Sequence, residues 1–203
     1  MKIPYWEETY KDDKIFTFRS DPNNSIVEFE HLFNKSGHVL DVGCGDGINS
    51  LYLANQGFLN IDAFDLSENA IAKLKRLSQA SGLKIHAWTD NLCDYNFDKF
   101  YDLIISFGTL HFVSRENWHN FIINAKKNTA IGGFHIIQLF SNKVPASPDI
   151  SSYAIGLADD GEIKELYKDW KIIQYKSYIF EEEHPDVPKH SHASNKIVVQ
   201  RIQ

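Results

Sequence analysis

Apolar residues along the chain group into short continuous runs that alternate with stretches of helical spacing. Five of the short runs predict buried strands, at residues 38–43, 60–67, 83–89, 101–107 and 132–140. Apolar positions spaced three to four apart predict helices at residues 24–35, 47–57, 68–82, 114–128 and 159–170. Two further strands are predicted at 171–182 and 195–202, with a polar loop over 181–195 between them.

The alternation of strand and helix through residue 140 predicts an α/β fold, a doubly wound sheet that is mostly parallel with helices on both faces. The two closing strands have no helix between them, so they pair antiparallel if they are neighbours. We therefore expect seven strands, one of them antiparallel near an edge. The whole chain, 1–203, is predicted to be one domain: an N-terminal aromatic lid and helix (1–36), a cofactor-binding core (37–140), and a substrate-side helix with the closing strands (141–203).

The composition narrows the classes of partner and compartment. The chain has 203 residues, 43% of them hydrophobic and 24% charged, with a net charge of −6. Lys and Arg form no face-sized run, which argues against nucleic acid, and no apolar run approaches the roughly 18 residues of a membrane span. The two cysteines and the lack of a secretory segment favour a cytoplasmic protein with reduced thiols, either a monomer or a homodimer.

A glycine-rich turn follows the first predicted strand, within "LDVGCGDGINSLYLA" at residues 40–54. In a doubly wound sheet such a turn lies at the ligand-binding edge, where glycine lets the backbone approach a ligand. The spacing is G-x-G-x-G, one residue shorter than the G-x-G-x-x-G of dinucleotide sites. Asp41 and Asp46 add negative charge, which disfavours a diphosphate and favours a cation. S-adenosylmethionine, a sulfonium with an amino group and no phosphate, satisfies that requirement.

Residues at the following strand ends complete a site for this cofactor. Asp41 is placed to receive its amino group, and Asp65, at the end of the second strand, to accept hydrogen bonds from the ribose hydroxyls. Asp65 is also a common helix-capping residue and Asn91 a common turn residue, so both interpretations stay open. The predicted cofactor contacts are Arg19, Asp41, Gly43, Cys44, Gly45, Gly47, Asn49, Ser50, Asp65, Leu66, Asp90, Asn91, Leu92 and Ser106.

Three roles among these contacts concern the adenine and the cofactor carboxylate. Leu66 and Leu92 are expected to lie against the adenine, and Asp90 and Asn91 to hydrogen-bond its edge. Arg19 is a candidate partner of the carboxylate, with an exposed surface arginine as the alternative. Aromatic residues near the start of the sequence are predicted either to form a lid that excludes water or to pack on the sheet: Trp6, Tyr10, Phe16 and Phe18.

These motifs resemble the class I S-adenosylmethionine-dependent methyltransferases, and more narrowly the tellurite-resistance protein B-like branch. The resemblance rests on "LDVGCGDGINSLYLA", "DAFDLS", "YDLIISFGTLHF", "GEIKELYKDW" and a His-containing stretch before the last strand. It implies S-adenosylmethionine as cofactor, S-adenosylhomocysteine as product, and a small acceptor such as tellurite, selenite or a thiol. The family usually has Arg at Ile48 and an Arg after its late histidine, which His184 matches; here Pro185 follows, and His190 and His192 stand where a later Arg would be.

Four histidines are candidates for a catalytic base, because histidine can accept a proton near neutral pH: His184, His190, His192 and His111. The alternatives are a solvated loop for the first three and a satisfied core histidine for His111. If residues 190–192 are extended, His190 and His192 point to the same side. The H-x-H spacing beside glutamates is by itself a weak metal signal, so no metal is expected.

Two other functions stay open at this level. The missing family arginines are compatible with a non-catalytic S-adenosylmethionine-binding module of the same fold. A nicotinamide oxidoreductase is the third possibility, and the short glycine spacing and the two acids argue against it.

Overall fold

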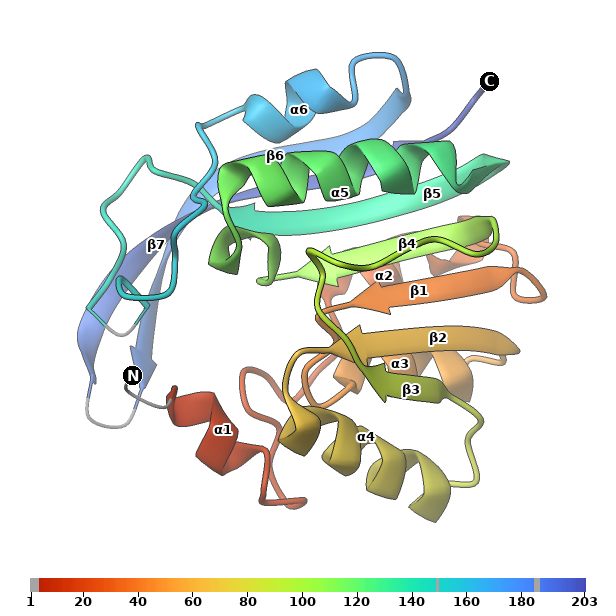
Figure 1. Ribbon diagram of the computed structural model, residues 1–203, viewed down its shortest axis with the longest axis horizontal. Coiled ribbons are helices and arrows are strands. Elements are labelled where there is room, and N and C mark those ends of the chain that lie inside the picture. The colour runs from red at the N-terminus through yellow and green to blue at the C-terminus, as the bar shows by residue number, and fades with distance from the viewer. Residues whose placement is uncertain (1–3, 149, 185–186) are drawn as a thin grey trace.

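The computed structural model describes residues 4–148, 150–184 and 187–203. Within them the chain forms one seven-stranded sheet, whose strands lie side by side in Figure 1. Its strands are β1 (His38–Val42), β2 (Asn60–Asp65), β3 (His86–Thr89), β4 (Tyr101–Phe107), β5 (Thr129–Phe140), β6 (Lys171–His184) and β7 (Val187–Gln200).

The strand order is β3-β2-β1-β4-β5-β7-β6. Strands β1 to β5 pair in parallel, whereas β7 is antiparallel to both of its neighbours, β5 and β6. The prediction of a seven-stranded, mostly parallel sheet with one reversed strand near an edge is therefore confirmed. The order reverses between β1 and β4, so the carboxyl ends of these two strands flank the crevice where ligands bind in such sheets.

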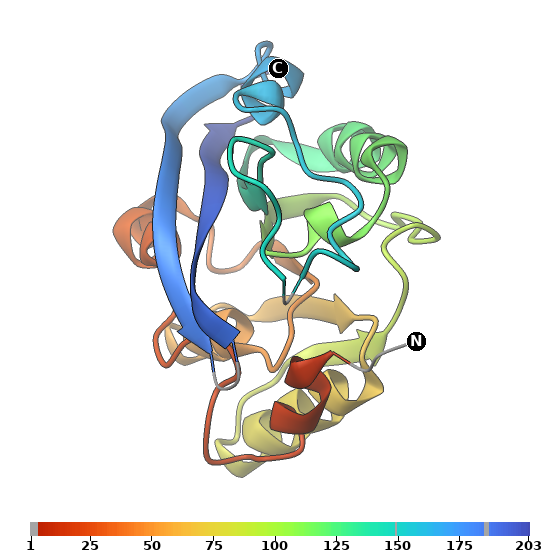
Figure 2. The same cartoon turned by 90° about the vertical axis from the view of Figure 1, so that its left-hand side faces the viewer.

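The helices cover both faces of the sheet (Figures 1 and 2). Leu53 and Ile26 pack on one face together with Leu74, while Trp118 and Ile163 pack on the other. The first face carries α2 (Asn24–Phe29), α3 (Ile48–Asn55) and α4 (Glu68–Ala80), and the second carries α5 (Arg115–Lys127) and α6 (Glu162–Leu166). Shorter elements are α1 (Tyr5–Thr9) and the 3-10 turns η1 (Glu30–Leu32) and η2 (Leu110–Phe112).

Local sequence explains where the longer helices begin. Ser67 accepts a hydrogen bond from the Ala70 amide at the start of α4, and Ser114 does the same for Asn117 at the start of α5. Gly47, at a φ of 81°, precedes α3 in the left-handed conformation. The helix predicted over 24–35 is shorter than expected, because it gives way to a 3-10 turn after Phe29. None of the helices in the described ranges is long and apolar enough to cross a membrane.

The predicted polar loop over 181–195 is wrong. Those of its residues that the structure describes continue β6 and β7, with Glu182 opposite His190 and Phe180 opposite His192. Its polar residues suggested a loop, yet the described residues from 187 to 193 pair with β6, and β5 joins as a second neighbour only from Ser194 onward. The resulting hairpin extends past the carboxyl ends of the parallel strands, on the left of Figure 1.

Candidate active site

The glycine turn follows β1 at the point where the strand order reverses. The amides of Gly43 and Cys44 both donate to the Phe64 carbonyl at the end of β2, which ties the turn to the neighbouring strand. Gly43, Gly45 and Gly47 all have positive φ values, of 65°, 54° and 81°. A Cβ at Gly43 would lie 2.1 Å from the Thr109 side chain, and one at Gly47 2.2 Å from that of Leu74.

Contacts within the protein thus account for much of the glycine requirement. Gly43 and Gly47 are fixed by close contacts within the protein, while Gly45 faces a more open space beneath the Tyr10 hydroxyl. Cys44, within the turn, is buried, and burial raises the pKa of its thiol well above the usual value. A thiol that stays protonated is a poor nucleophile, so the contribution of Cys44 is its small size and its backbone.

Asp41 is a buried carboxyl group at the carboxyl end of β1. It is 1% exposed and accepts a hydrogen bond of 2.6 Å from the Ser50 hydroxyl, at the start of α3. Burial raises the pKa of Asp41 to about 7, against the lowering effect of Ser50. A carboxyl group with this pKa is readily ionised by a nearby cation, because the attraction offsets the loss of hydration. Ser50 therefore acts on this site through Asp41.

Asp65 faces the glycine turn from the end of β2. One carboxylate oxygen accepts a 2.8 Å hydrogen bond from the Gly45 amide, and the other a 2.9 Å bond from the Ser67 amide. Desolvation raises the pKa of Asp65, and the two amides act in the opposite direction. Each oxygen retains capacity for a second donor. Asp65 thus contacts the start of α4 through the Ser67 amide and also faces the glycine turn. Its interpretation as a helix-capping residue is therefore compatible with its interpretation as a cofactor contact.

Asp46, in contrast, is neutralised by a partner that the sequence analysis missed. Its carboxylate lies 3.0 Å from the ammonium of Lys73, in α4, and both side chains are buried. It also accepts a hydrogen bond of 2.8 Å from the Thr17 amide. Asp41 and Asp65, rather than Asp46, are therefore the carboxyl groups that would repel a diphosphate. The ion pair of Asp46 and Lys73, together with the Thr17 hydrogen bond, instead holds the N-terminal segment against the glycine turn.

That N-terminal segment lies across the ligand-binding edge of the sheet (Figure 2). Tyr10 is 4% exposed, and desolvation followed by the charge of Asp65 raises the pKa of its phenol well above the usual value. Trp6 packs against Phe112, with ring centroids 5.4 Å apart, and against Tyr153 at 5.7 Å. These contacts hold the N-terminal segment against Phe112 and Tyr153, with the Tyr10 hydroxyl beside Gly45.

The predicted adenine contacts separate into two groups. Leu66 is 72% exposed just after Asp65, so its side chain is accessible to a planar ligand, whereas Leu92 is 7% exposed and packs within the core. Asp90 accepts hydrogen bonds from the Trp88 indole at 3.0 Å and from the Asn91 amide at 2.7 Å. The geometry leaves Leu66 as the most available of these four predicted contacts.

Asn91 closes a local turn. Its carbonyl oxygen accepts a hydrogen bond from the Cys93 amide at 3.0 Å, and its side-chain amide donates to Asp94 at 2.8 Å. This pattern is the turn interpretation that the sequence left open. Ser106 is likewise used internally, since its buried hydroxyl donates to the Val42 carbonyl at 3.0 Å and joins β4 to β1.

A buried polar cluster lies beside the start of α3. Asn49 accepts a hydrogen bond from the Asn23 amide at 2.9 Å, and Asn23 donates to Gln138 at 3.2 Å. Lys196, from β7, is 9% exposed with its ammonium 3.5 Å from the Asn23 side-chain oxygen. Burial lowers the pKa of Lys196, and Lys176 and Arg19 add to the effect. Arg19 itself is exposed, and the sequence analysis missed Lys196.

His111 lies in η2, after β4, and is fully buried. Its Nδ1 accepts a hydrogen bond from the Phe140 amide at 3.3 Å, so the neutral ring carries its proton on Nε2. Burial, with a contribution from His192, lowers the pKa of His111 to about 3. Because Nδ1 is engaged and Nε2 is protonated, His111 is suited to donate a hydrogen bond and not to act as a base.

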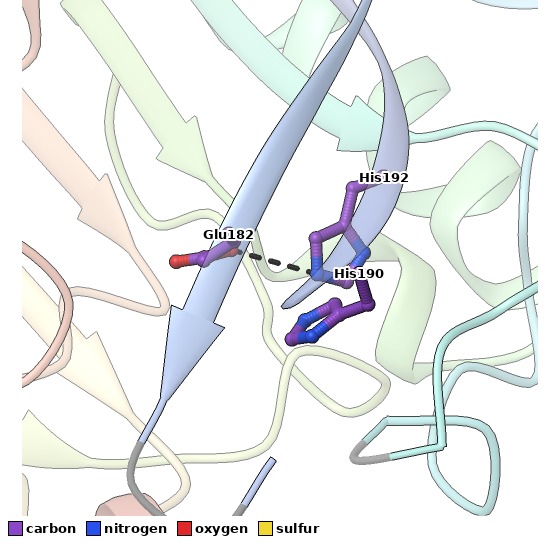
Figure 3. Close-up of side chains that lie close together, drawn as sticks. All are labelled: Glu182, His190 and His192. Atoms are coloured by element: carbon purple, nitrogen blue, oxygen red, sulfur yellow. Dashed lines mark ion pairs between the residues drawn. The ribbon is translucent and has the colours of Figure 1, made fainter. Parts of the chain in front are cut away.

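The late histidines do converge, as Figure 3 shows. His190 and His192 point to the same side of β7, with ring centroids 4.8 Å apart. Glu182, on β6, lies 3.5 Å from Nε2 of His192. His192 also stacks on Phe140, with centroids 4.5 Å apart. The side chain of His184 lies outside the described residues, so its predicted role is untested.

Comparison with known proteins places this site in context. The family described as "Tellurite resistance protein TehB" matches residues 7–200. A "Probable S-adenosyl-L-methionine-dependent methyltransferase TehB" of Haemophilus influenzae is 34% identical over 139 residues, 68% of this chain and 47% of that protein. A "Ubiquinone biosynthesis O-methyltransferase" of Rickettsia conorii is 34% identical over 114 residues, 55% of this chain and 38% of that protein.

Solved structures support the same relationship. TehB from Haemophilus influenzae superposes with a TM-score of 0.78 at 25% identity, over 97% of this chain and 66% of that one. The magnesium protoporphyrin IX methyltransferase of Synechocystis, solved with bound S-adenosylmethionine, has a TM-score of 0.62 at 19% identity and covers 87% of this chain and 74% of that one. The second likeness shows the fold alone. The chain spans about half the length of the curated relatives it matches.

Proposed function

Because the chain belongs to the TehB family of tellurite resistance proteins, we propose that it transfers a methyl group from S-adenosylmethionine to a small-molecule acceptor. The prediction of a class I methyltransferase fold of this branch is confirmed by the family match and by the superposition on TehB.

One observation carries the proposal: two carboxyl groups, Asp41 and Asp65, flank a positive-φ glycine turn at the switch point of the sheet. Asp41 is suited to a cation, since an amino group nearby would restore the ionised form that burial disfavours. Asp65 is suited to a diol, because both of its oxygens can accept one further hydrogen bond. A nucleoside carrying an amino acid presents both groups, whereas a diphosphate would be repelled.

Methyl transfer from a sulfonium requires the protein mainly to align the reacting groups and to exclude water from them. The acceptor's nucleophile donates an electron pair to the methyl carbon while the carbon–sulfur bond breaks, and the bonding pair returns to sulfur. The sulfonium thereby becomes the neutral thioether of S-adenosylhomocysteine. The N-terminal cover around Trp6 and Tyr10 would exclude water from this step. In this proposal the single domain consists of an N-terminal lid and helix (1–36), a cofactor-binding core (37–140), and a substrate-side helix with the closing strands (141–203).

The acceptor is proposed to be soft or oxyanionic, such as tellurite, selenite or a thiol. The support is the group of histidines beside η2 and the β6–β7 hairpin. His111 would donate a hydrogen bond from Nε2 to a negatively charged acceptor. His190, His192 and the predicted His184 are the candidates for removing a proton from a protonated acceptor such as a thiol.

Calorimetry with S-adenosylhomocysteine tests the cofactor first, and transfer of a labelled methyl group to tellurite, selenite and thiols tests the acceptor. The proposal expects saturable binding that Asp65→Asn weakens, and methyl transfer to at least one acceptor. Absence of binding at millimolar ligand would refute the cofactor assignment. Binding without transfer to any of these acceptors would instead identify a non-catalytic module.

A further inference from the structure

The β6–β7 hairpin brings together three potential metal ligands from two strands. His190 and His192 are two residues apart on β7, so their side chains share one face. Glu182 is the cross-strand partner of His190 on β6, which puts its carboxylate beside both rings. Figure 3 shows the three side chains converging on the same side of the hairpin. The H-x-H spacing alone was a weak signal, and the strand register supplies the third ligand.

The distances within this cluster are close to those that a metal ion needs. One ligand atom from each residue lies within 4.8 Å of the others, and the Glu182 carboxylate is 3.5 Å from Nε2 of His192. Two donors bound to one tetrahedral ion at about 2.0–2.1 Å lie about 3.3 Å apart. The carboxylate and His192 already meet this separation. The other separations, of at most 4.8 Å, exceed this value by no more than about 1.5 Å, which is within the reach of torsions at Glu182 and His190.

The surroundings hold the ligands in place and limit water. His192 is 3% exposed, stacked on Phe140 at 4.5 Å and beside Phe180 at 5.4 Å between centroids. Nε2 of His190 is itself buried. An apolar wall around charged or metal-bound groups strengthens their interactions. The ligands therefore come from rigid, paired strands and not from a loop.

The charge balance favours a cation at this point. Glu182 brings one negative charge and the two imidazoles none in their metal-binding form. Lys189, the residue before His190, pairs with Glu181 at 2.6 Å, and alternation along the strands places that pair on the opposite face. His111, behind Phe140, has its pKa lowered to about 3 and is neutral at physiological pH. The nearest lysines on the same face of the hairpin among the described residues, Lys176 and Lys196, are four or more residues along the strands from the cluster.

The geometry points to a binding site for one divalent transition-metal ion, with Zn²⁺ the best match, formed by Glu182, His190 and His192. Two imidazoles and one carboxylate suit Zn²⁺, Co²⁺, Ni²⁺ or Fe²⁺ and not Mg²⁺ or Ca²⁺, which prefer oxygen ligands. Three protein ligands leave at least one coordination position open, as in sites that bind a further molecule and unlike closed structural sites.

The location of the cluster indicates a role for the open coordination position of the metal ion. Phe140 is shared between His192 and His111, so the cluster adjoins the residues that follow β4 at the ligand-binding edge. An ion there would hold an oxyanion or a thiolate on the acceptor side, and with His190 and His192 as its ligands only His184 of the late histidines would remain a candidate base. This role rests on the proposed function, whereas the metal site itself does not require methyl transfer.

A simple ion pair between Glu182 and His192 is the competing explanation, and metal titration separates the two. Protein stripped with a chelator is titrated with Zn²⁺ by calorimetry and with Co²⁺ by visible absorption, in both cases without cofactor. We expect one ion per chain and a Co²⁺ spectrum of low coordination number. Glu182→Gln and His190→Asn should each weaken binding by about tenfold or more. Neither side chain is fully buried, so both variants are expected to fold.

Two control variants exclude adventitious binding. Glu181→Gln changes the neighbouring carboxylate on the other face of β6, and His119→Asn removes a surface histidine that pairs with Glu162. Both should bind Zn²⁺ as the parent protein does. Absence of binding, or binding that Glu182→Gln and His190→Asn leave unchanged, would overturn the site. Because these titrations contain no S-adenosylmethionine, their outcome is independent of whether the chain transfers methyl groups.

Discussion

Replacing Asp41 with asparagine tests whether this buried carboxyl group lowers the stability of the fold and binds the amino group of the cofactor, as proposed. The pKa of Asp41 is raised to about 7 by burial, whereas an aspartate in an unfolded chain titrates near 3.9. At pH values between these two pKa values, Asp41 is protonated in the folded protein and ionised in the unfolded chain. Stability contributed by this group therefore decreases as pH rises from about 4 to about 7, and stays low above that.

The size of the effect follows from the pKa difference. With about 1.4 kcal/mol per pKa unit, Asp41 lowers the free energy of unfolding by about 2 kcal/mol at pH 5.5 and about 4 kcal/mol at pH 8. Asparagine has no charge to desolvate, and its carbonyl can accept the Ser50 hydrogen bond. The stability advantage of Asp41→Asn over the parent should therefore grow by about 2 kcal/mol between pH 5.5 and pH 8.

Urea unfolding at the two pH values measures this difference, and calorimetry measures the functional consequence. The variant should bind S-adenosylhomocysteine about tenfold or more weakly at pH 8, because it cannot form an ion pair with the amino group. The parent should lose affinity below pH 7, as binding must then displace a proton. A stability difference that is independent of pH would refute the reasoning.

Asp62 provides a matched control on the next strand. Desolvation raises the pKa of Asp62, but hydrogen bonds from His86 and Lys99 bring it below the usual value. A lowered pKa gives stability that is present above the unfolded value and lost only in acid. Asp62→Asn should therefore destabilise the protein at both pH 5.5 and pH 8, in contrast to Asp41→Asn, and leave cofactor binding unchanged.

Three further substitutions probe the same region. Asp65→Asn should weaken S-adenosylhomocysteine binding by about tenfold to a hundredfold in calorimetry, because the ribose loses a charged acceptor; unchanged affinity would contradict its role. Lys73→Met should lower the free energy of unfolding in urea by about 3–5 kcal/mol, since it leaves Asp46 buried without its partner; a loss below about 1 kcal/mol would mean that the pair matters little. Gly47→Ala should lower the thermal midpoint, because its Cβ would lie 2.2 Å from the Leu74 side chain at a φ of 81°; an unchanged midpoint would show that the turn can relax.

The fold could be read from the sequence because strand and helix periodicities alternate so regularly up to residue 140. The same regularity located the ends of β1 and β2, and with them the orientation of Asp41 and Asp65 toward the glycine turn. Boundaries were less reliable: β3 begins at His86, not at residue 83, and β5 begins at Thr129, not at residue 132. Periodicity identifies an element, while local pairing decides where it stops.

What the sequence could not show depends on contacts between distant segments. Lys73 looks like a solvated position on an amphipathic helix, and only the packing of α4 on the glycine turn reveals its buried pair with Asp46. The polar end of β7 looks like a loop until its pairing with β6 is seen. Glu182 becomes a candidate ligand through cross-strand register, which no spacing along the chain encodes.

A crystal structure of the chain with S-adenosylhomocysteine tests the central claim most directly. We expect the ribose hydroxyls on the Asp65 carboxylate and the amino group beside Asp41, directly or through one water. A ligand bound away from the Gly43–Gly47 turn, or a nicotinamide dinucleotide occupying that turn with comparable affinity, would contradict the account.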